Sequence, residues 1–227
     1  GCFVTRKTIR TMEDFAAAVG LSRPTVSKYF NDPQSVRATT RGKIEAAIKQ
    51  TGFRPNIFAV NLNRRRSKII GLIIPDPTDP FYMTLAQRVE MGATEAGYLA
   101  LVLSSNGRPE EEARAIETIK ALNVAGAIIA PLGEKSRHAK LKALGREMPL
   151  IYIDAPLDDE CPFVGTNNFQ SIPLITEYLC RSGELPTYFD TPVTNSNATD
   201  RRKAYLATMV RLNHEPRFAN VPPANEW

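Results

Sequence analysis

From Ile69 onward, the chain alternates short apolar runs with amphipathic stretches. The first four runs read "IIGLII", "YLALVL", "GAIIA" and "PLIYI", and each of the first three is followed by a segment with helical spacing. This alternation is typical of a parallel sheet that helices cover on both faces. We therefore expect a doubly wound α/β lobe over about residues 69–155, with ligands bound outside the carboxyl ends of its strands.

A second set of the same units begins after that lobe. It consists of "FVGT", the helical stretch 170–180, "PTYF" and the helical stretch 198–212. These segments begin a second doubly wound lobe over about residues 156–227, and we expect that lobe to be incomplete. An open sheet edge and a half-formed cleft would predict low stability or a partner that covers the edge.

Charge divides the chain into two parts. The 227 residues include 29 Lys and Arg and 24 Asp and Glu, for a net charge of +5. Residues 1–68 hold 14 Lys and Arg against 4 Asp and Glu, whereas the remainder holds 15 against 20. A basic head on an acidic body favours a phosphate-binding module fused to another domain. The alternative is a solvated surface of uneven charge, although Arg64, Arg65, Arg66 and Lys68 gather at the junction itself.

The basic head carries the signals of short helices. Residues 11–19 have apolar side chains at helical spacing and precede Gly20, which favours a helix with a left-handed stop. Ser22 stands at an N-cap position and Pro24 in the first turn, so a second helix should run from about Arg23 to Phe30.

A third helix should run from about Arg41 to Gln50, with Gly52 at its end. Short helices of which the first two are joined by a glycine turn favour a helix-turn-helix module. Such a module presents the N-terminal part of its second helix to the major groove of DNA. The alternative is a small helical bundle without a ligand.

The second helix of this module should have an apolar inner side formed by Val26, Tyr29 and Phe30. On the outer side, an arginine can bond guanine in bidentate fashion and a proline can touch a thymine methyl group, whereas hydroxyl and amide side chains suit phosphates. The candidate DNA-binding residues of this region are Ser22, Arg23, Pro24, Thr25, Ser27, Lys28 and Asn31.

Several other classes of protein are disfavoured. No apolar run approaches the roughly 18 residues of a spanning helix, and no secretory signal is present, so we expect a cytoplasmic protein without a membrane partner. The sequence opens "GCFV" without an initiator Met, so upstream residues could be missing.

The sequence also lacks the signals of a metal site, a disulfide framework or an enzyme. Neither metal nor disulfide spacing is found among Cys2, Cys161 and Cys180, and the two histidines, His138 and His214, lack ligand spacing. No nucleotide-binding or hydrolase motif occurs, and we expect neither an enzyme nor a cofactor or metal site.

The run "TMEDFAAAVGLSRPTVSKYFND", continued by "TTRGKIEAAIKQTGFRPNIFAVNL", resembles the headpiece of the lactose-repressor family of bacterial transcription regulators. The stretch "KIIGLIIPDPTDPFYMTLAQRVEMGATEAGY" is similar to the first strand and helix of that family's effector domain, which resembles periplasmic sugar-binding proteins. The resemblance implies an all-α helix-turn-helix domain over 8–54, a hinge helix and linker over 55–68, and a periplasmic-binding-protein-like α/β effector domain over 69–227.

The resemblance also implies a role for the hinge, residues 56–63. In the family, two hinge helices of a dimer open the minor groove with a leucine. Asn56, Ala59 and Leu62 become DNA-binding candidates here, with Ala59 near the partner hinge and Leu62 as the wedge between base steps. The alternative is that the apolar hinge residues pack on the body.

The family holds its small-molecule effector with residues at strand ends. By resemblance, the effector-binding candidates are Asp79, Phe81, Tyr82, Asp154, Asn197 and Arg201. An aromatic ring can stack on a sugar or base, and carboxylate, amide and guanidinium groups can bond hydroxyls. As alternatives, Asp79 caps a helix that starts near Pro80, Phe81 belongs to the core, and Arg201 pairs with Asp200 or another surface acid.

Two departures from the family fall in the second lobe. Glu184 stands where the family usually has His, and Ala204 stands where Gly is usual. Family chains also continue for about another 100 residues, a usual size for half a domain.

The sequence therefore predicts a sequence-specific DNA-binding transcription regulator, a repressor, that a small effector such as a sugar controls. Its partners would be double-stranded operator DNA, the effector and a second copy in a homodimer, with a tetramer as the alternative assembly. A stand-alone sugar-binding component of a transport system is the competing prediction, and it leaves the basic helical head unexplained.

Overall fold

The computed structural model describes residues 9–56, 67–158, 160–190 and 195–221. The chain forms two units, Gly1–Ser67 and Lys68–Trp227. The expected hinge residues Ala59 and Leu62 lie outside the described residues. Within the described ranges, no helix is both long enough and apolar enough to cross a membrane.

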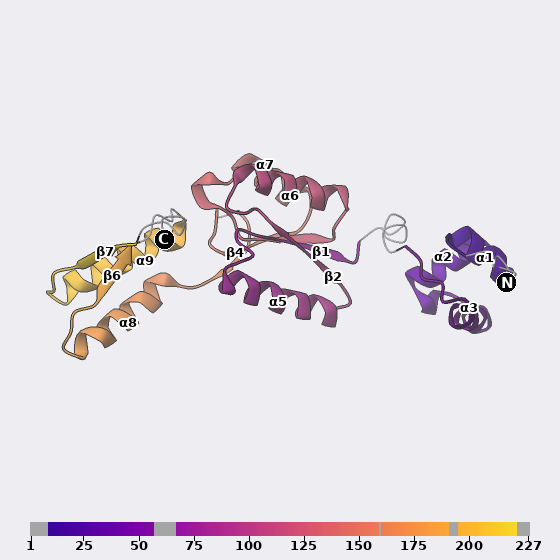
Figure 1. Cartoon of the computed structure of the whole chain (residues 1–227), viewed down its shortest axis with the longest axis horizontal. Helices are drawn as coiled ribbons and strands as arrows, with labels where there is room; N and C mark the ends of the chain where they lie inside the picture. The colour runs from indigo at the N-terminus through magenta and orange to yellow at the C-terminus, as the bar shows by residue number, and fades with distance from the viewer. Residues whose placement is uncertain (1–8, 57–66, 159, 191–194, 222–227) are drawn as a thin grey trace, which may run out of the picture. The chain divides into compact units, whose positions relative to one another are not determined.

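The first unit contains the helices that the capping residues predict. Helix α1 spans Met12–Val19, α2 spans Arg23–Asn31, a short 3-10 helix η1 spans Pro33–Ser35, and α3 spans Ala38–Thr51 (Figure 1). Thr11 and Asp14 form a capping box at the start of α1, and Gly20 ends that helix with φ of 68°. Gly52 ends α3 in the same left-handed conformation. Because left-handed backbone suits glycine, these two residues fix where the chain turns.

An aromatic cluster holds the helices of the first unit together. The rings of Phe15 and Phe53 stack with centroids 4.4 Å apart, and Phe30 lies 6.1 Å from each of them. Val26 of α2 and Ile44 of α3 are fully buried against this cluster. The prediction that Val26, Tyr29 and Phe30 face inward is confirmed.

The second unit is built on a five-stranded parallel sheet in the order β2-β1-β3-β4-β5. The sheet strands are β1 Ile69–Ile74, β2 Leu99–Ser104, β3 Gly126–Ile129, β4 Leu150–Asp154 and β5 Phe163–Gly165. The connecting helices are α5 Pro80–Glu95, α6 Pro109–Ala121 and α7 His138–Glu147, with a 3-10 helix η2 at Gly133–Lys135.

Helices cover both faces of this sheet, as the sequence predicts. Helix α5 lies on one face and helices α6 and α7 on the other (Figure 1). On the interior strand β1, Leu72 and Ile74 pack in the cluster that includes α5, whereas Ile69 and Ile73 pack in the cluster that includes α6 and α7. Strand β1 is therefore buried on both sides, which explains its unbroken apolar sequence.

The remaining segments form a smaller α/β part. Helix α8 spans Asn168–Arg181, β6 Thr187–Asp190, α9 Ser196–Arg211 and β7 Arg217–Asn220. Strands β6 and β7 pair in parallel. The Tyr205 hydroxyl of α9 lies 2.8 Å from the carbonyl of Pro186 and accepts the backbone N–H of Arg217 at 3.0 Å. This one side chain therefore ties the helix to both strands of the pair.

The structure corrects two expectations and adds one strand that the sequence did not predict. "FVGT" was expected to open the second lobe, but β5 pairs with β4 as the edge strand of the first sheet. Helix α3 begins at Ala38 rather than near Arg41, because Arg37 starts it without a side-chain cap that the sequence could reveal. Strand β7 was not predicted, since only four residues form it and one of them is half-buried while the others are exposed.

Gly71 of β1 is an interior position of this sheet at which a side chain does not fit. A Cβ there would lie 2.8 Å from Cγ2 of Ile119, an atom held by the packing of α6. Gly71→Ala should therefore lower the free energy of unfolding by about 1–3 kcal/mol. Urea denaturation followed by circular dichroism measures this loss.

Gly92→Ala is the matched control. Gly92 lies in α5, and a Cβ there meets nothing within 4 Å. The control should be neutral or stabilising by up to about 1 kcal/mol, because alanine favours a helix over glycine. Equal stability of the two variants would contradict the packing described for β1.

Candidate functional site

The start of α2 is fixed by its own cap. The backbone N–H of Thr25 donates to Oγ of Ser22 at 3.4 Å, and the two hydroxyls lie 2.8 Å apart. Pro24 occupies the first turn, where a missing N–H has no consequence. Ser22 and Thr25, both predicted to meet DNA, are thus also the residues that set the direction of the helix.

The outer side of α2 carries exposed basic side chains. Arg23, Pro24 and Lys28 are exposed, whereas Thr25, Ser27 and Asn31 are half-buried. The guanidinium of Arg23 forms an ion pair through Nε with Glu13 of α1. Asn56, the one hinge candidate within the described residues, is exposed. The arrangement presents exposed cationic side chains in the first and last turns of a short helix, with Pro24 beside Arg23, which suits contact with a groove of DNA.

In the second unit, Asp154 is the centre of a hydrogen-bonded group. It ends β4 with φ of 68°, an uncommon conformation for a residue with a side chain. The side-chain amide of Asn197 donates to the carbonyl of Asp154 at 2.8 Å and to its Oδ1 at 2.7 Å. The Tyr82 hydroxyl donates to the other carboxylate oxygen at 2.9 Å. These bonds join α5 and β4 to the start of α9.

Asn168, which was not among the predicted site residues, extends this group to Arg201. Its Nδ2 donates to Oδ1 of Asn197 at 2.7 Å, and its Oδ1 accepts from Nε of Arg201 at 3.0 Å. Asn168 is 5% exposed and Asn197 4% exposed, so each side-chain amide is satisfied inside the protein. The structure therefore brings Tyr82, Asp154, Asn197 and Arg201 into one group, in which Asn168, a residue that the sequence did not single out, connects Asn197 to Arg201.

The other effector-binding candidates lie at the start of α5. Asp79 caps this helix by accepting the backbone N–H of Phe81 at 2.8 Å, as one of the two interpretations of the sequence expected. Phe81 is 51% exposed and does not belong to the core. Its ring lies 5.0 Å from that of Tyr82. An exposed aromatic ring beside the hydrogen-bonded group could stack on a ligand.

Burial and acidic neighbours change the acidity of Tyr82. Burial raises the pKa of its hydroxyl above the usual value, and the carboxylates of Asp154 and Asp79 raise it further, while Arg201 lowers it. The hydroxyl therefore stays protonated and remains a hydrogen-bond donor to Asp154. Within the described part of the chain, no three His, Cys, Asp or Glu side chains gather into a metal site.

A helix-turn-helix unit joined to a doubly wound α/β unit defines a two-part architecture. Residues 11–56 match the family described as bacterial regulatory proteins of the lacI family. Residues 67–217 match the periplasmic binding proteins and sugar-binding domain of the LacI family. The chain belongs to the LacI family.

Curated relatives agree with this assignment. The chain is 30% identical over 210 residues to the HTH-type transcriptional regulator PtxS of Pseudomonas plecoglossicida, covering 90% of this chain and 61% of that protein. It is 29% identical over 218 residues to the ribose operon repressor of Escherichia coli K12, covering 95% and 64%. The chain thus spans less than two thirds of the length of these relatives.

Solved structures share the fold. A lac repressor dimer bound to operator and the anti-inducer ONPF superposes with a TM-score of 0.80 at 23% identity, covering 93% of this chain and 64% of that one. A periplasmic binding protein/LacI transcriptional regulator from Alkaliphilus metalliredigens complexed with D-xylulofuranose gives 0.60 at 21% identity, covering 68% and 57%. The predicted combination of a helix-turn-helix headpiece and a periplasmic-binding-protein-like domain is confirmed.

Replacing Tyr82 with Phe should make the stability of the chain less sensitive to alkaline pH. Because its pKa is raised, folded Tyr82 keeps its proton where the unfolded chain, with a tyrosine pKa of 10.0, begins to lose it. Its contribution to stability is therefore complete below about pH 9 and is lost as the pH rises above about 10, by at most about 1.4 kcal/mol per pH unit. Urea unfolding at about pH 8 and pH 11 should show a larger loss for the wild type than for Tyr82→Phe, and equal losses would contradict the assignment.

Proposed function

We propose that this chain is a sequence-specific DNA-binding transcription regulator, acting as a repressor, whose DNA binding is controlled by a small effector. The observation that carries the proposal is the pair of exposed basic side chains of α2, Arg23 and Lys28, beside Pro24 on a cap-fixed helix of a unit rich in Lys and Arg. Two relatives support it, since one is named a transcriptional regulator and another an operon repressor.

On DNA, α2 would lie in the major groove with its exposed side toward the bases. Arg23 and Lys28 would donate to base edges, and Pro24 would touch a thymine methyl group. Ser22, Thr25, Ser27 and Asn31 would fix the register through phosphates. The hinge residues Asn56, Ala59 and Leu62 would follow into the minor groove, where the leucine would wedge between base steps.

In the body, the effector would bind beside the group centred on Asp154. Carboxylate, amide and guanidinium groups that converge near an exposed aromatic ring suit a ligand with several hydroxyls. Asp79, Phe81, Tyr82, Asp154, Asn197 and Arg201 would contact it. Names of related proteins support a sugar, because they include ribose and sucrose operon repressors and a complex with D-xylulofuranose.

The effector would act by linkage. The bonds of Asp154 to Tyr82 and Asn197 connect elements of both parts of the body, so a ligand that prefers one arrangement of these elements would shift their equilibrium. Coupling between two sites in such proteins is typically about 1–3 kcal/mol. A shift of this size changes the affinity for DNA by about 5- to 150-fold.

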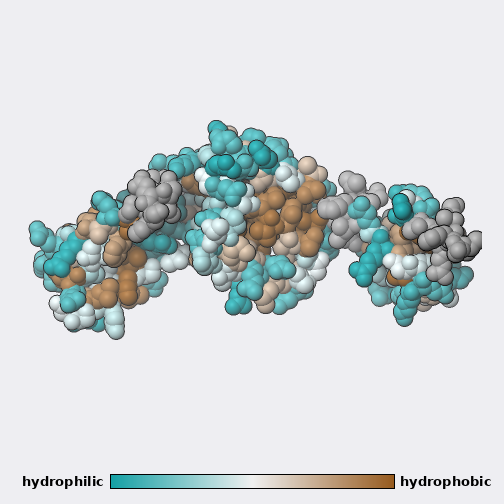
Figure 2. Space-filling model, in the orientation of Figure 1, coloured by the Kyte–Doolittle hydropathy of each residue, from teal (hydrophilic) through white to brown (hydrophobic). Residues whose placement is uncertain are grey.

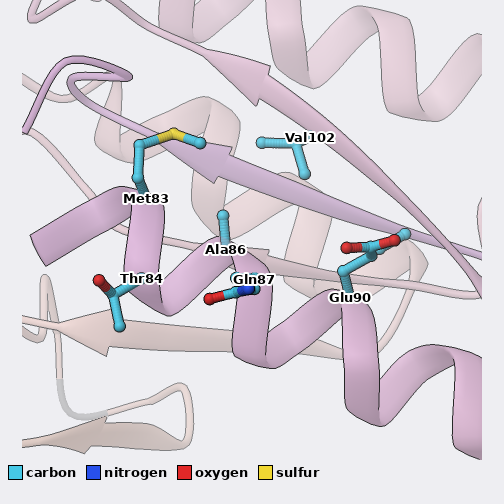
Figure 3. Close-up of a pocket in the computed structure, with 7 residues that line it drawn as sticks. Met83, Thr84, Ala86, Gln87, Glu90 and Val102 are labelled. Carbon is cyan, nitrogen blue, oxygen red and sulfur yellow. The ribbon is translucent and has the colours of Figure 1, made fainter. Parts of the chain in front are cut away.

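A second copy of the chain would bind the face formed by α5 and the edge strand β2. Met83, Leu99 and Val102 are 47%, 50% and 41% exposed there, and Figure 2 shows apolar side chains gathered over this part of the body. Figure 3 shows Met83, Ala86 and Val102 around one surface pocket of about 690 Å³. A dimer would present two α2 helices to a pseudo-palindromic operator, and the lac repressor dimer bound to operator shares the fold of this chain.

The alternative of a stand-alone sugar-binding transport component is disfavoured by the helix-turn-helix unit and its match to bacterial regulators. A transcription regulator binds chromosomal DNA, which in a bacterium lies in the cytoplasm. We therefore place its action in the bacterial cytoplasm, on the nucleoid when it is bound to DNA.

Lys28→Ala tests the proposed DNA contact. Binding selection from random duplexes with the full chain first supplies the preferred sequence. The variant should bind that duplex about 1–3 kcal/mol more weakly if Lys28 reads a base, or show a salt dependence reduced by about one unit if it contacts a phosphate. Affinities at two or more salt concentrations distinguish these effects.

Lys49→Ala is the matched control, because Lys49 lies in the last turn of α3 as Lys28 does in that of α2, and both side chains are exposed. It should bind like the wild type. If Lys28→Ala also matched the wild type at every salt concentration, α2 would not be the reading helix.

Arg201→Ala tests the effector site. A thermal-shift screen of the wild type with D-ribose, D-xylulose and sucrose should find a sugar that raises the melting temperature, because a ligand stabilises the state that binds it. The variant should bind that sugar at least about tenfold more weakly, since a charged hydrogen bond contributes about 1.5–3 kcal/mol. Lys203→Ala, an exposed change on the same helix, should keep wild-type binding. A sugar that binds Arg201→Ala and the wild type equally would contradict the site.

A further inference from the structure

An ion pair connects the two helices of the helix-turn-helix motif at its outer surface. Glu13 lies in the first turn of α1, and Arg23 is the first residue of α2. The carboxylate Oε1 of Glu13 meets Nε of Arg23. The two side chains are 61% and 52% exposed, so the pair lies at the surface on which Arg23 would meet a base.

The carboxylate of Glu13 has no evident place on a surface that binds phosphates. Residues 1–68 contain four acidic side chains, and two of them, Asp14 and Asp32, accept backbone N–H groups at the starts of α1 and η1. Glu13 instead directs its negative charge to the side of the recognition helix. Repulsion from DNA phosphates would weaken binding, so this carboxylate needs a compensating role at the interface.

Stabilisation of the folded first unit does not explain the presence of the Glu13 carboxylate. An ion pair between side chains that are both more than half exposed contributes little to folding, because water and salt screen it. The first turn of α1 is also already closed by the capping box of Thr11 and Asp14. Loss of Glu13 should therefore leave the first unit folded.

The geometry of arginine suggests what the pair does. A guanidinium is a planar fork with five N–H donors, and a carboxylate on Nε leaves the two Nη groups able to donate to O6 and N7 of guanine. A long side chain held in one direction before binding also loses less conformational freedom on contact with its target. A partner on Nε thus favours one plane and one direction for the fork.

We propose that Glu13 is a specificity-determining positioning residue, which holds Arg23 so that its guanidinium reads a guanine in the operator. The proposal rests on the proposed function, because it requires that α2 reads duplex DNA. Glu13 acts through Arg23 and does not itself contact a base. Its removal would therefore change which base is preferred at one position of each half-site, and would leave the other positions as they are.

Binding selection with the full chain and its variants tests the proposal. The wild type should select a guanine at one position, and Arg23→Ala should lose that preference and no other. Glu13→Ala should weaken the same preference by about fivefold or more relative to the other bases, and Glu13→Gln, whose amide oxygen can still accept from Nε, should weaken it less. Melting temperatures of all variants should stay near that of the wild type.

Glu45→Gln is the matched control, because it removes one negative charge from an exposed site on α3. Like Glu13→Gln, it should raise the affinity for all duplexes slightly at low salt, but it should not change the preferred bases. The double variant Glu13→Ala with Arg23→Ala should select the same bases as Arg23→Ala alone.

Three results would overturn the proposal. Glu13→Ala could select the same guanine as strongly as the wild type, which would show that Arg23 needs no partner. Glu13→Ala could change base preference in the Arg23→Ala background, which would show that Glu13 contacts a base directly. A wild type that selects no sequence at all would reject the proposed function and this inference together, whereas the first two results would leave the proposed function intact.

Discussion

The packing of α2 on the aromatic cluster of the first unit decides which of its residues can meet a partner. Val26 is fully buried against Phe15 and Phe53, so the helix cannot rotate about its axis without exposing this side chain. With Val26 inside, Arg23 and Lys28 are exposed, and the cap formed by Ser22 and Thr25 sets where the helix begins. The side of α2 that we propose to contact DNA is thus determined by the packing of a small core.

A comparable constraint shapes the second unit. Strand β1 is buried by helices on both faces, and the parallel strands beside it end at the same edge of the sheet. Asp154 stands at the end of β4, where its left-handed backbone and its three hydrogen bonds to Tyr82 and Asn197 depend on each other. A residue held in an uncommon conformation needs such support from its surroundings. The support comes from separate elements, which makes this position sensitive to how they are arranged.

The sequence predicts most of this architecture because its signals are local. Gly20, Gly52 and Ser22 mark helix ends by backbone chemistry that does not depend on distant residues. The strand "FVG" carries no such information, because three residues cannot say which sheet they join, and its pairing with β4 is a tertiary choice. Asn168 could not be identified from the sequence as a site residue, because its role also depends on tertiary contacts. Its role comes from contacts with Asn197 and Arg201, which lie 29 and 33 residues away in the chain.

The central claim is that the outer side of α2, over residues 22–28, is the surface that contacts duplex DNA. Amide chemical-shift mapping of the isotopically labelled full chain, with and without its selected duplex, tests this claim directly. The account predicts that the largest changes fall on residues 22–28, with smaller changes on the helix α3 and on the sheet of the second unit. Changes concentrated on α3 or on the second unit, with residues 22–28 unaffected, would contradict it.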